Sequence, residues 1–232
     1  MYRHLVTSSY RNTSKPYHHG NLHEAILHEA ITLGREGGPQ AVTIRAATRA
    51  VGVSPTAAYR HFKDQAELLD AVANASTAEL IERLSAAFQD TEGTIVDKMM
   101  AAGFAYYHYA LDEPDFFECM MASRGYDIPG GLATATDGPN EDPRVQAAHN
   151  FYCYMEQYAR ECGQVPDRKH MMRNCLAGWS TVHGFTVLCT SGHLASLSDE
   201  QREEMAKAVF ASAIRGLDFE NSSDPHRYHN KA

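Results

Sequence analysis

The stretch from residue 43 to residue 63 constrains the fold of this chain more than any other segment. It reads TIRAATRAVGVSPTAAYRHFK. Its pattern predicts one short helix over residues 44–50 and a second over residues 55–62, separated by a tight turn at residues 51–53. Gly52 stands in the turn, where the backbone needs a left-handed residue. The segment therefore predicts helix-turn-helix geometry.

Capping residues indicate where the helices of this region begin. Thr43 is a suitable N-cap for the first short helix, and Ser54-Pro55 supplies a cap and a first helical position for the second. Asp64 is expected to cap a third, longer helix, and Glu67 three residues later completes a capping box. Three helix starts therefore fall within about twenty-five residues of sequence.

Apolar residues recur at helical spacing along most of the remaining chain. Ahead of the motif they predict a helix from Asn21 that ends at Gly37, Gly38 and Pro39. Further helices are expected over residues 64–88, 95–111, 115–123, 143–161, 168–189 and 199–219. No strand alternation competes with them, so an all-α chain is expected. Residues 124–142 contain four glycines and two prolines, and this long connector is interpreted as either a lid or a locally disordered loop.

Charge is distributed unevenly along the sequence. The whole chain has a formal net charge of −8, which taken alone argues against a phosphate-rich partner. Up to Lys63, however, eight lysines and arginines stand against three carboxylates, a net charge of +5, and the rest of the chain carries −13. No carboxylate occurs between Gly37 and Lys63. The charge distribution indicates an acidic protein with a basic N-terminal part up to Lys63, which we call the head.

The second helix of the motif has side chains suited to DNA. It presents Thr56, Ala57, Tyr59, Arg60 and His61, a set of small, hydroxylic and basic groups. Such groups fit the major groove and the phosphates that flank it. The motif is therefore expected to bind double-stranded DNA.

Longer stretches of the sequence resemble a known family. GNLHEAILHEAITLGREGG, TIRAATRAVGVS and PTAAYRHFKDQAELLDAV are similar to the N-terminal DNA-binding domain of TetR-type transcriptional regulators, over about residues 20–75. The tetrapeptide at residues 59–62, followed by Glu-Leu-Leu at 67–69, is more specific than a general helix-turn-helix. Residues 179–184 are similar to the Trp…His-Gly signature of one C-terminal ligand-binding subtype of that family.

The resemblance implies a set of DNA contacts in this chain. The expected DNA-binding residues are Thr43, Arg45, Ser54, Thr56, Ala57, Tyr59, Arg60, His61 and Lys63. Of these, Thr56 and Ala57 are expected to face bases. Two positions depart from the family pattern. Thr48 replaces a small Ala, which would loosen the helix contact, and Gln65 replaces a phosphate-binding Lys, so that role passes to Lys63.

The C-terminal part is unusually rich in aromatic and methionine side chains, more than one helical face uses. Tyrosines need a hydroxyl partner and methionines adapt to irregular shapes, so some are expected to line a cavity for a small, largely apolar or aromatic effector. The expected lining residues are Phe104, Tyr107, Phe117, Tyr152, Met155, Trp179 and His183. The alternative is that these side chains are ordinary core, and that His183 is simply a buried, hydrogen-bonded histidine.

The last two helices are expected to form a homodimer's four-helix bundle, as the resemblance implies. Their apolar residues are Val182, Phe185, Leu188, Ala206, Val209, Phe210, Ala213, Ile214 and Leu217. A dimer would bind a palindromic operator with half-sites about one helical turn, roughly 34 Å, apart. The long helix over residues 64–88 would transmit effector binding to the DNA-binding head.

These inferences give a domain plan and a function. A flexible basic arm is expected at residues 1–19, the DNA-binding domain at 20–66, the ligand-binding and dimerisation domain at 67–220 and a tail at 221–232. Five widely spaced cysteines and the lack of a long apolar run favour a cytoplasmic protein. The expected function is a ligand-responsive transcriptional regulator, a repressor on family grounds, with no cofactor.

Two other functions compete with this one. A metal-sensing regulator would use some of the 13 histidines, but His18, His19 and the pair His226 and His229 lie in expected tails. An enzyme is disfavoured because the histidines of the stretch His23 to His28 are five residues apart, whereas a zinc-peptidase helix needs a spacing of four. No phosphate-binding or nucleophile motif is present either.

Overall fold

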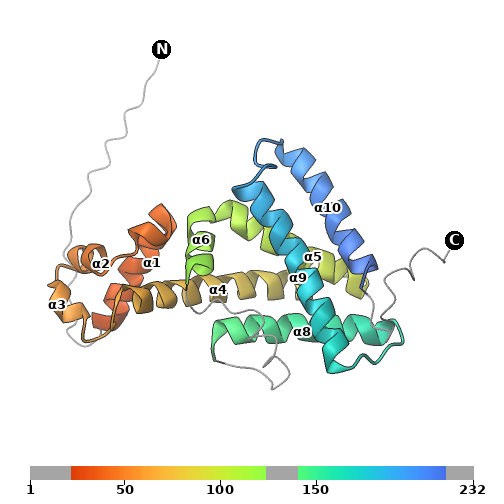
Figure 1. The fold of residues 1–232 in the computed structure, drawn as a ribbon, viewed down its shortest axis with the longest axis horizontal. Helices are drawn as coiled ribbons and strands as arrows, with labels where there is room; N and C mark the ends of the chain where they lie inside the picture. The colour runs from red at the N-terminus through yellow and green to blue at the C-terminus, as the bar shows by residue number, and fades with distance from the viewer. Residues whose placement is uncertain (1–21, 124–140, 218–232) are drawn as a thin grey trace, which may run out of the picture.

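The computed structural model describes residues 22–123 and 141–217 (Figure 1). Its helices are α1 (Leu22–Ala41), α2 (Ile44–Val51), α3 (Pro55–Ala58), α4 (Gln65–Asp90), α5 (Ile95–Asp112), α6 (Pro114–Ala122), α8 (Pro143–Glu161), α9 (Arg168–Thr190) and α10 (Asp199–Arg215). These two ranges contain no strand, and the predicted all-α fold is confirmed. The predicted arm and tail, and nearly all of the predicted lid or loop, lie outside the described residues.

Helix α4 connects the two ends of the molecule. Figure 1 shows α1, α2 and α3 gathered at one end and α8, α9 and α10 at the other, with α4 running between them. Its 26 residues give it a length of about 39 Å. Helices α5 and α6 pack alongside α4 between the two ends. The predicted boundary between residues 66 and 67 falls in the first turn of this helix.

The helix-turn-helix forms as the capping residues predict. The Thr43 hydroxyl accepts a hydrogen bond from the Ala46 N–H at 3.1 Å, and Gly52 ends α2 with a φ of 80°. The second helix is shorter than predicted, because α3 ends at Ala58 instead of Phe62. The chain continues in tight turns that bring Phe62, 2% exposed, back into the core.

One other local prediction needs correction, and a second concerns Thr48. Asp64 caps α4 by accepting from the Glu67 N–H at 2.9 Å, but the Glu67 carboxylate accepts from the Lys63 N–H and not from that of Asp64. The capping box is therefore displaced by one residue. Thr48 is fully buried, and its hydroxyl donates to the Ile44 carbonyl oxygen at 2.7 Å. Its polar group is therefore satisfied within α2.

One hydrophobic core spans the head, which contains α1 to α3, and the neighbouring part of the body, which contains α4 to α10. Ile26 and Phe62 from the head belong to the same buried cluster as Val72 of α4 and Phe116 and Met120 of α6. The Gly37 and Gly38 break in α1, where Gly38 has a φ of 65°, is also as predicted. Because this core is continuous, a shift of α4 or α6 is felt directly by α1.

Candidate functional site

The helix-turn-helix places most of the predicted DNA-binding side chains on its surface. The exposed members of the set are Arg45, Ser54, Thr56, Tyr59, Arg60, His61 and Lys63. Thr43 and Ala57 are half-buried, and Thr43 also caps α2. Tyr59 is 58% exposed, which is high for a large aromatic side chain. These positions are open to a partner from solvent.

Buried neighbours hold this surface in place. Ala58 and Phe62 anchor the second helix and the turns after it in the core, at 0% and 2% exposure. The His23 ring of α1 stacks on Phe62 with ring centroids 4.7 Å apart, and the His61 ring lies 6.2 Å from that of His23. The surface side chains are therefore carried by a packed three-helix unit.

The head presents basic groups that are not neutralised by carboxylates. Arg45, Arg49, Arg60 and Lys63 are exposed, and within residues 22–123 and 141–217 none of them forms an ion pair. Arg35 instead pairs with Glu79 and Glu113 in the body. The exposed cations are therefore available to phosphates.

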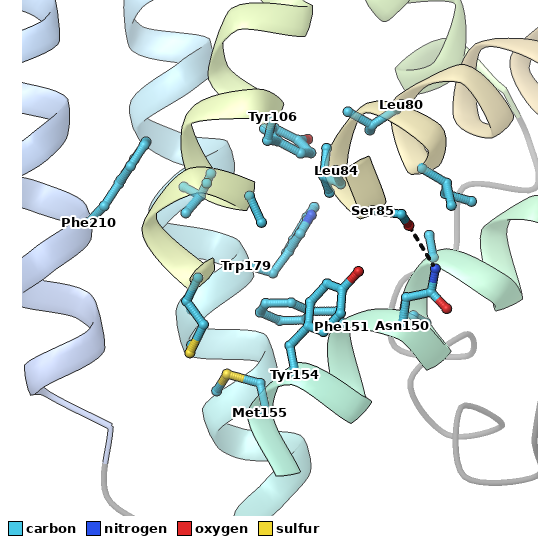
Figure 2. A pocket seen from close by; sticks show the side chains of 18 of the residues that line it. Leu80, Leu84, Ser85, Tyr106, Asn150, Phe151, Tyr154, Met155, Trp179 and Phe210 are labelled. Atoms are coloured by element: carbon cyan, nitrogen blue, oxygen red, sulfur yellow. Dashed lines mark hydrogen bonds between the residues drawn. The ribbon is translucent and has the colours of Figure 1, made fainter. Parts of the chain in front are cut away.

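At the other end of α4 lies a cavity of about 170 Å³ (Figure 2). It is enclosed mainly by α4, α5, α8, α9 and α10. The lining residues are Thr77, Leu80, Ile81, Leu84, Ser85, Met99, Ala102, Gly103, Tyr106, Met120, Arg144, Ala147, Ala148, Asn150, Phe151, Tyr154, Met155, Gly178, Trp179, Val182, Phe210, Ala213, Ile214 and Leu217. Most of them are apolar, so the cavity suits an apolar ligand.

Of the seven predicted ligand-binding residues, all of which lie in the described ranges, Met155 and Trp179 line this cavity and the other five do not. Figure 2 shows the Trp179 ring projecting between α5, α8 and α9 toward Tyr106 and Tyr154. Its other face stacks on His183, with ring centroids 4.8 Å apart and planes inclined by 7°. Trp179 is thus held between the cavity and the core.

The other five predicted residues lie behind the cavity wall. Phe104 packs edge-on against Phe210 and Tyr107 packs against Phe185, because their places on α5 face α9 and α10. Tyr152 packs in a separate cluster between α8 and α9. Phe117 lies behind Tyr106 at a ring-centroid distance of 5.7 Å. Helical spacing alone did not reveal which face of each helix points toward the cavity.

His183 supports the cavity wall from behind. Its Nδ1 lies 2.9 Å from the hydroxyl oxygen of Tyr106, which lines the cavity. Burial lowers the pKa of His183 below its ordinary value, so the neutral ring is favoured. The structure thus shows a half-buried, hydrogen-bonded histidine, which is close to the alternative expected from the sequence.

A group of polar residues at one side of the cavity was missed from the sequence. The Asn150 amide donates to the Ser85 hydroxyl at 3.4 Å, as Figure 2 shows, and Gln146 donates to the Asn150 oxygen at 2.6 Å. Ser85 also hydrogen-bonds to Tyr154. Gln146, Asn150 and Tyr154 are spaced four apart, so polar groups that repeat on one face of α8 were the available signal.

Two family models match the chain. "Bacterial regulatory proteins, tetR family" matches residues 26–72, and "Tetracyclin repressor-like, C-terminal domain" matches residues 99–213. The chain belongs to the TetR family. It is therefore a DNA-binding transcription regulator with a helix-turn-helix and a ligand-binding domain. Neither match distinguishes the Trp…His-Gly subtype, which stays a prediction.

Solved structures support the same TetR fold. A Rhodococcus sp. RHA1 protein described as of unknown function is 25% identical, with a TM-score of 0.63 over 88% of this chain and 98% of that one. A TetR variant from Acinetobacter baumannii AYE, in complex with minocycline, is 19% identical, with a TM-score of 0.57 over 82% and 93%. The regulator PfmR from Thermus thermophilus is 19% identical, with a TM-score of 0.51 over 83% and 98%. A search of curated proteins finds no match.

Two further observations concern the described residues alone. No helix there combines the length and the apolar character that a membrane crossing requires. No three His, Cys, Asp or Glu side chains there come together in a group that could hold a metal ion. The tail histidines of the metal-sensing alternative lie outside the described residues.

Proposed function

We propose that this TetR-family protein is a cytoplasmic, ligand-responsive repressor that binds a palindromic operator as a homodimer and is released by a small, largely apolar or aromatic effector. The observation that carries the proposal is that one helix, α4, joins a basic head to the end of the molecule that contains an apolar cavity. A ligand that changes the position of α4 also changes the position of the head. Repression, not activation, rests on what is typical of the family.

The contacts with DNA follow from the surface of the head. Thr56 and Ala57 on α3 face the bases, while Arg45, Arg60 and Lys63 neutralise phosphates around them. Phosphate contacts fix the register of the head on the duplex, and the side chains in the groove provide sequence discrimination. The acidic body, with −13 of the net charge beyond Lys63, is repelled by the duplex and favours approach through the head.

The dimer interface uses a different face of the last helices than the apolar pattern predicted. Val182, Phe185, Phe210 and Ile214 pack within the subunit, together with Ala206. Part of the surface of α9 and α10 instead carries small and scattered apolar side chains, next to exposed charged residues such as Glu204 and Lys207. Its exposed or half-buried members are Leu176, Ala177, Ser180, Thr181, Gly184, Leu188, Met205, Ala208 and Ser212. Small side chains allow helices of two subunits to approach closely, which a four-helix bundle requires.

We infer that the coupling between cavity and head uses two different faces of the same two turns of α4. Leu80 and Leu84 line the cavity. Glu79 and Arg83, one position before each, bind groups outside it. Glu79 pairs with Arg35 of α1 and with Arg83 at 3.0 Å, and the Arg35 guanidinium also lies 2.7 Å from the Glu113 carboxylate. A rotation of α4 that admits a ligand therefore strains the contact with α1.

A buried hydrogen-bond network strengthens this connection. The Ser76 hydroxyl on α4 donates to the Phe116 carbonyl oxygen of α6 at 2.9 Å, and the Tyr109 hydroxyl of α5 donates to the Ser76 carbonyl oxygen at 3.0 Å. Ser76 and Tyr109 are fully buried. Because buried polar groups lose free energy when their partners move away, α4, α5 and α6 are expected to shift as a unit.

Operator binding is the first test. The protein is titrated against DNA from upstream of its own and neighbouring genes at several salt concentrations, with fluorescence anisotropy as the readout. Arg45→Ala is expected to weaken binding and to reduce the salt dependence by about one phosphate contact. Arg160→Ala, an exposed arginine of α8 far from the head, is the matched control. Wild-type affinity in Arg45→Ala, or salt-independent binding, would contradict the assigned contacts.

The dimer interface has its own test. A side chain added at Gly184 meets no atom within 4 Å in the subunit, so Gly184→Arg is expected to fold while blocking the bundle. Sedimentation should then show a monomer where the wild type is a dimer. Gln157→Arg, on the exposed side of α8, should remain dimeric. A wild-type monomer, or a dimeric Gly184→Arg, would refute this interface.

A further inference from the structure

The polar side of the cavity contains a directed chain of hydrogen bonds. Gln146 donates to the Asn150 oxygen, and the Asn150 amide in turn donates to the Ser85 hydroxyl oxygen. A hydroxyl that accepts from Asn150 has its own hydrogen left to donate, and Ser85 also hydrogen-bonds to Tyr154. The chain of hydrogen bonds thus reaches Tyr154, which lines the cavity.

The Tyr154 ring is fixed in place. It stacks on Phe88 with ring centroids 3.7 Å apart and planes inclined by 11°. Figure 2 shows its hydroxyl between Trp179 and Ser85, at the centre of the space that the lining residues enclose. Burial raises the pKa of Tyr154, so the hydroxyl keeps its hydrogen throughout the neutral pH range. It is a positioned, uncharged donor.

The described walls of the cavity also offer no unshared group that would stabilise a ligand's charge. Among the described residues that line the cavity, Arg144 is the only one with a charged side chain. Its guanidinium is engaged by Asp142, with Nε to Oδ1 at 3.1 Å and Nη2 to Oδ2 at 2.9 Å. An ionised ligand would therefore lose its hydration without gaining an unshared counter-ion, at a cost of several kcal/mol in real proteins.

From these observations we infer that the effector is a neutral aromatic molecule with one oxygen acceptor, such as an ester or ketone, which accepts a hydrogen bond from Tyr154 while its ring lies against Trp179 and Phe151. The inference deepens the proposed function and rests on it. The size agrees, because the cavity of about 170 Å³ is slightly larger than an apolar cavity of about 150 Å³ that binds benzene. Carboxylates and ammonium compounds are expected to bind much more weakly.

The single tryptophan of the chain provides a direct assay. Trp179 lines the cavity, so its fluorescence reports occupancy without DNA. Three probes of similar shape are titrated into the full chain: methyl benzoate, benzoate and ethylbenzene, with calorimetry as a second readout. Methyl benzoate is expected to bind at least about 100-fold more tightly than benzoate, because only the anion buries an unpaired charge.

Variants of two tyrosines on one helix test the hydrogen bond. Tyr154→Phe keeps the stack on Phe88 and should weaken methyl benzoate about three- to tenfold, while ethylbenzene stays within about twofold. Tyr152→Phe, which does not line the cavity, should leave both probes within about twofold. The pattern rests on differences between probes, so a general loss of folding cannot produce it.

Three results would overturn the ligand class. They are benzoate binding as tightly as methyl benzoate, Tyr154→Phe affecting both neutral probes equally or neither of them, and the absence of binding by any neutral probe. Operator affinity is then measured with methyl benzoate present. If the probes bind in the expected pattern while operator affinity is unchanged, the ligand class stands and ligand-responsive repression is refuted.

Discussion

The ion pairs of Arg35 make the most direct prediction about how the head is attached to the body. This side chain of α1 contacts Glu79 of α4 and Glu113 at the start of α6, and its guanidinium lies 4.1 Å above the Phe116 ring. The perturbations are Arg35→Met, Glu113→Gln and the double variant. Methionine keeps an apolar stem for packing but removes the charge and the hydrogen bonds. The measured quantity is the free energy of unfolding at one fixed protein concentration.

The expected magnitude follows from the exposure of the groups. The Arg35, Glu79 and Glu113 side chains are 34%, 27% and 28% exposed, so water screens them in part. Two such pairs at up to about 1 kcal/mol each, with a cation–π contact of about 0.5 kcal/mol, give a loss of about 2 kcal/mol for Arg35→Met. The coupling between Arg35 and Glu113 in the double-mutant cycle should be about 1 kcal/mol.

The pH dependence has a definite sign. Burial raises the pKa of Glu79, but the hydrogen bonds and charges of Arg35 and Arg83 outweigh it, and the net pKa lies below the ordinary 4.5. Stability from this group is therefore complete above about pH 4.5 and is lost as the pH falls through the lower folded-state value. The difference between wild type and Arg35→Met should shrink over that range, and it should also shrink at high salt.

Urea unfolding followed by circular dichroism measures these values. The exposed pair of Arg160 and Glu156 on α8 is the control, because at 71% and 41% exposure Arg160→Met should cost less than about 0.5 kcal/mol. Additive effects of Arg35→Met and Glu113→Gln, or a cost for Arg35→Met no larger than for Arg160→Met, would refute the reasoning. The attachment of α1 would then depend on apolar packing alone.

Three further predictions concern separate parts of the chain. Thr43→Ala removes the side-chain acceptor at the start of α2 and should destabilise the protein by about 1 kcal/mol, seen as a lower Tm. Burial lowers the pKa of His183 below 6.5, so this residue reduces the stability of the protein as the pH falls below about 6.5. His183→Asn preserves an acceptor for Tyr106 and should therefore reduce the loss of stability between pH 7 and pH 5. Cys153 and Cys162 are exposed and should react with a thiol reagent in the native protein, whereas the three buried thiols should react only after unfolding. More than two reactive thiols in the native protein would contradict the packing.

The head could be predicted well from the sequence because its signals are local. Thr43 caps α2, and Gly52 adopts the left-handed backbone at the end of that helix. These roles depend on neighbours within four residues, which the sequence shows directly. The end of α3 was harder, because Phe62 leaves the helix to reach a core contributed by distant segments. The displaced capping box at Glu67 has the same origin, since the turn before Asp64 brings the Lys63 N–H within reach of the carboxylate.

The cavity depended on information that the sequence does not contain. The pattern identified α5 and α8 as helices rich in aromatic residues, but it did not specify which neighbour each face meets. Phe104 and Tyr106 are two residues apart and thus on different sides of α5, one against Phe210 and the other at the cavity. Polar residues such as Asn150 that repeat on one face of a helix are a better signal, because a half-buried amide needs a partner and marks a place where a ligand's polar group is also satisfied.

The expected dimer interface shows the same limit of prediction from sequence, because an apolar pattern does not specify which surface buries it. The most apolar residues of α9 and α10 were assigned to an interface between subunits, yet Phe185 and Phe210 pack against each other edge-on within one subunit. Large apolar side chains are usually buried against other parts of their own folded chain. The face that stays exposed has small residues around Ser180 and Gly184. A partner helix would pack there because small side chains let two backbones approach closely, and not because the face is strongly hydrophobic.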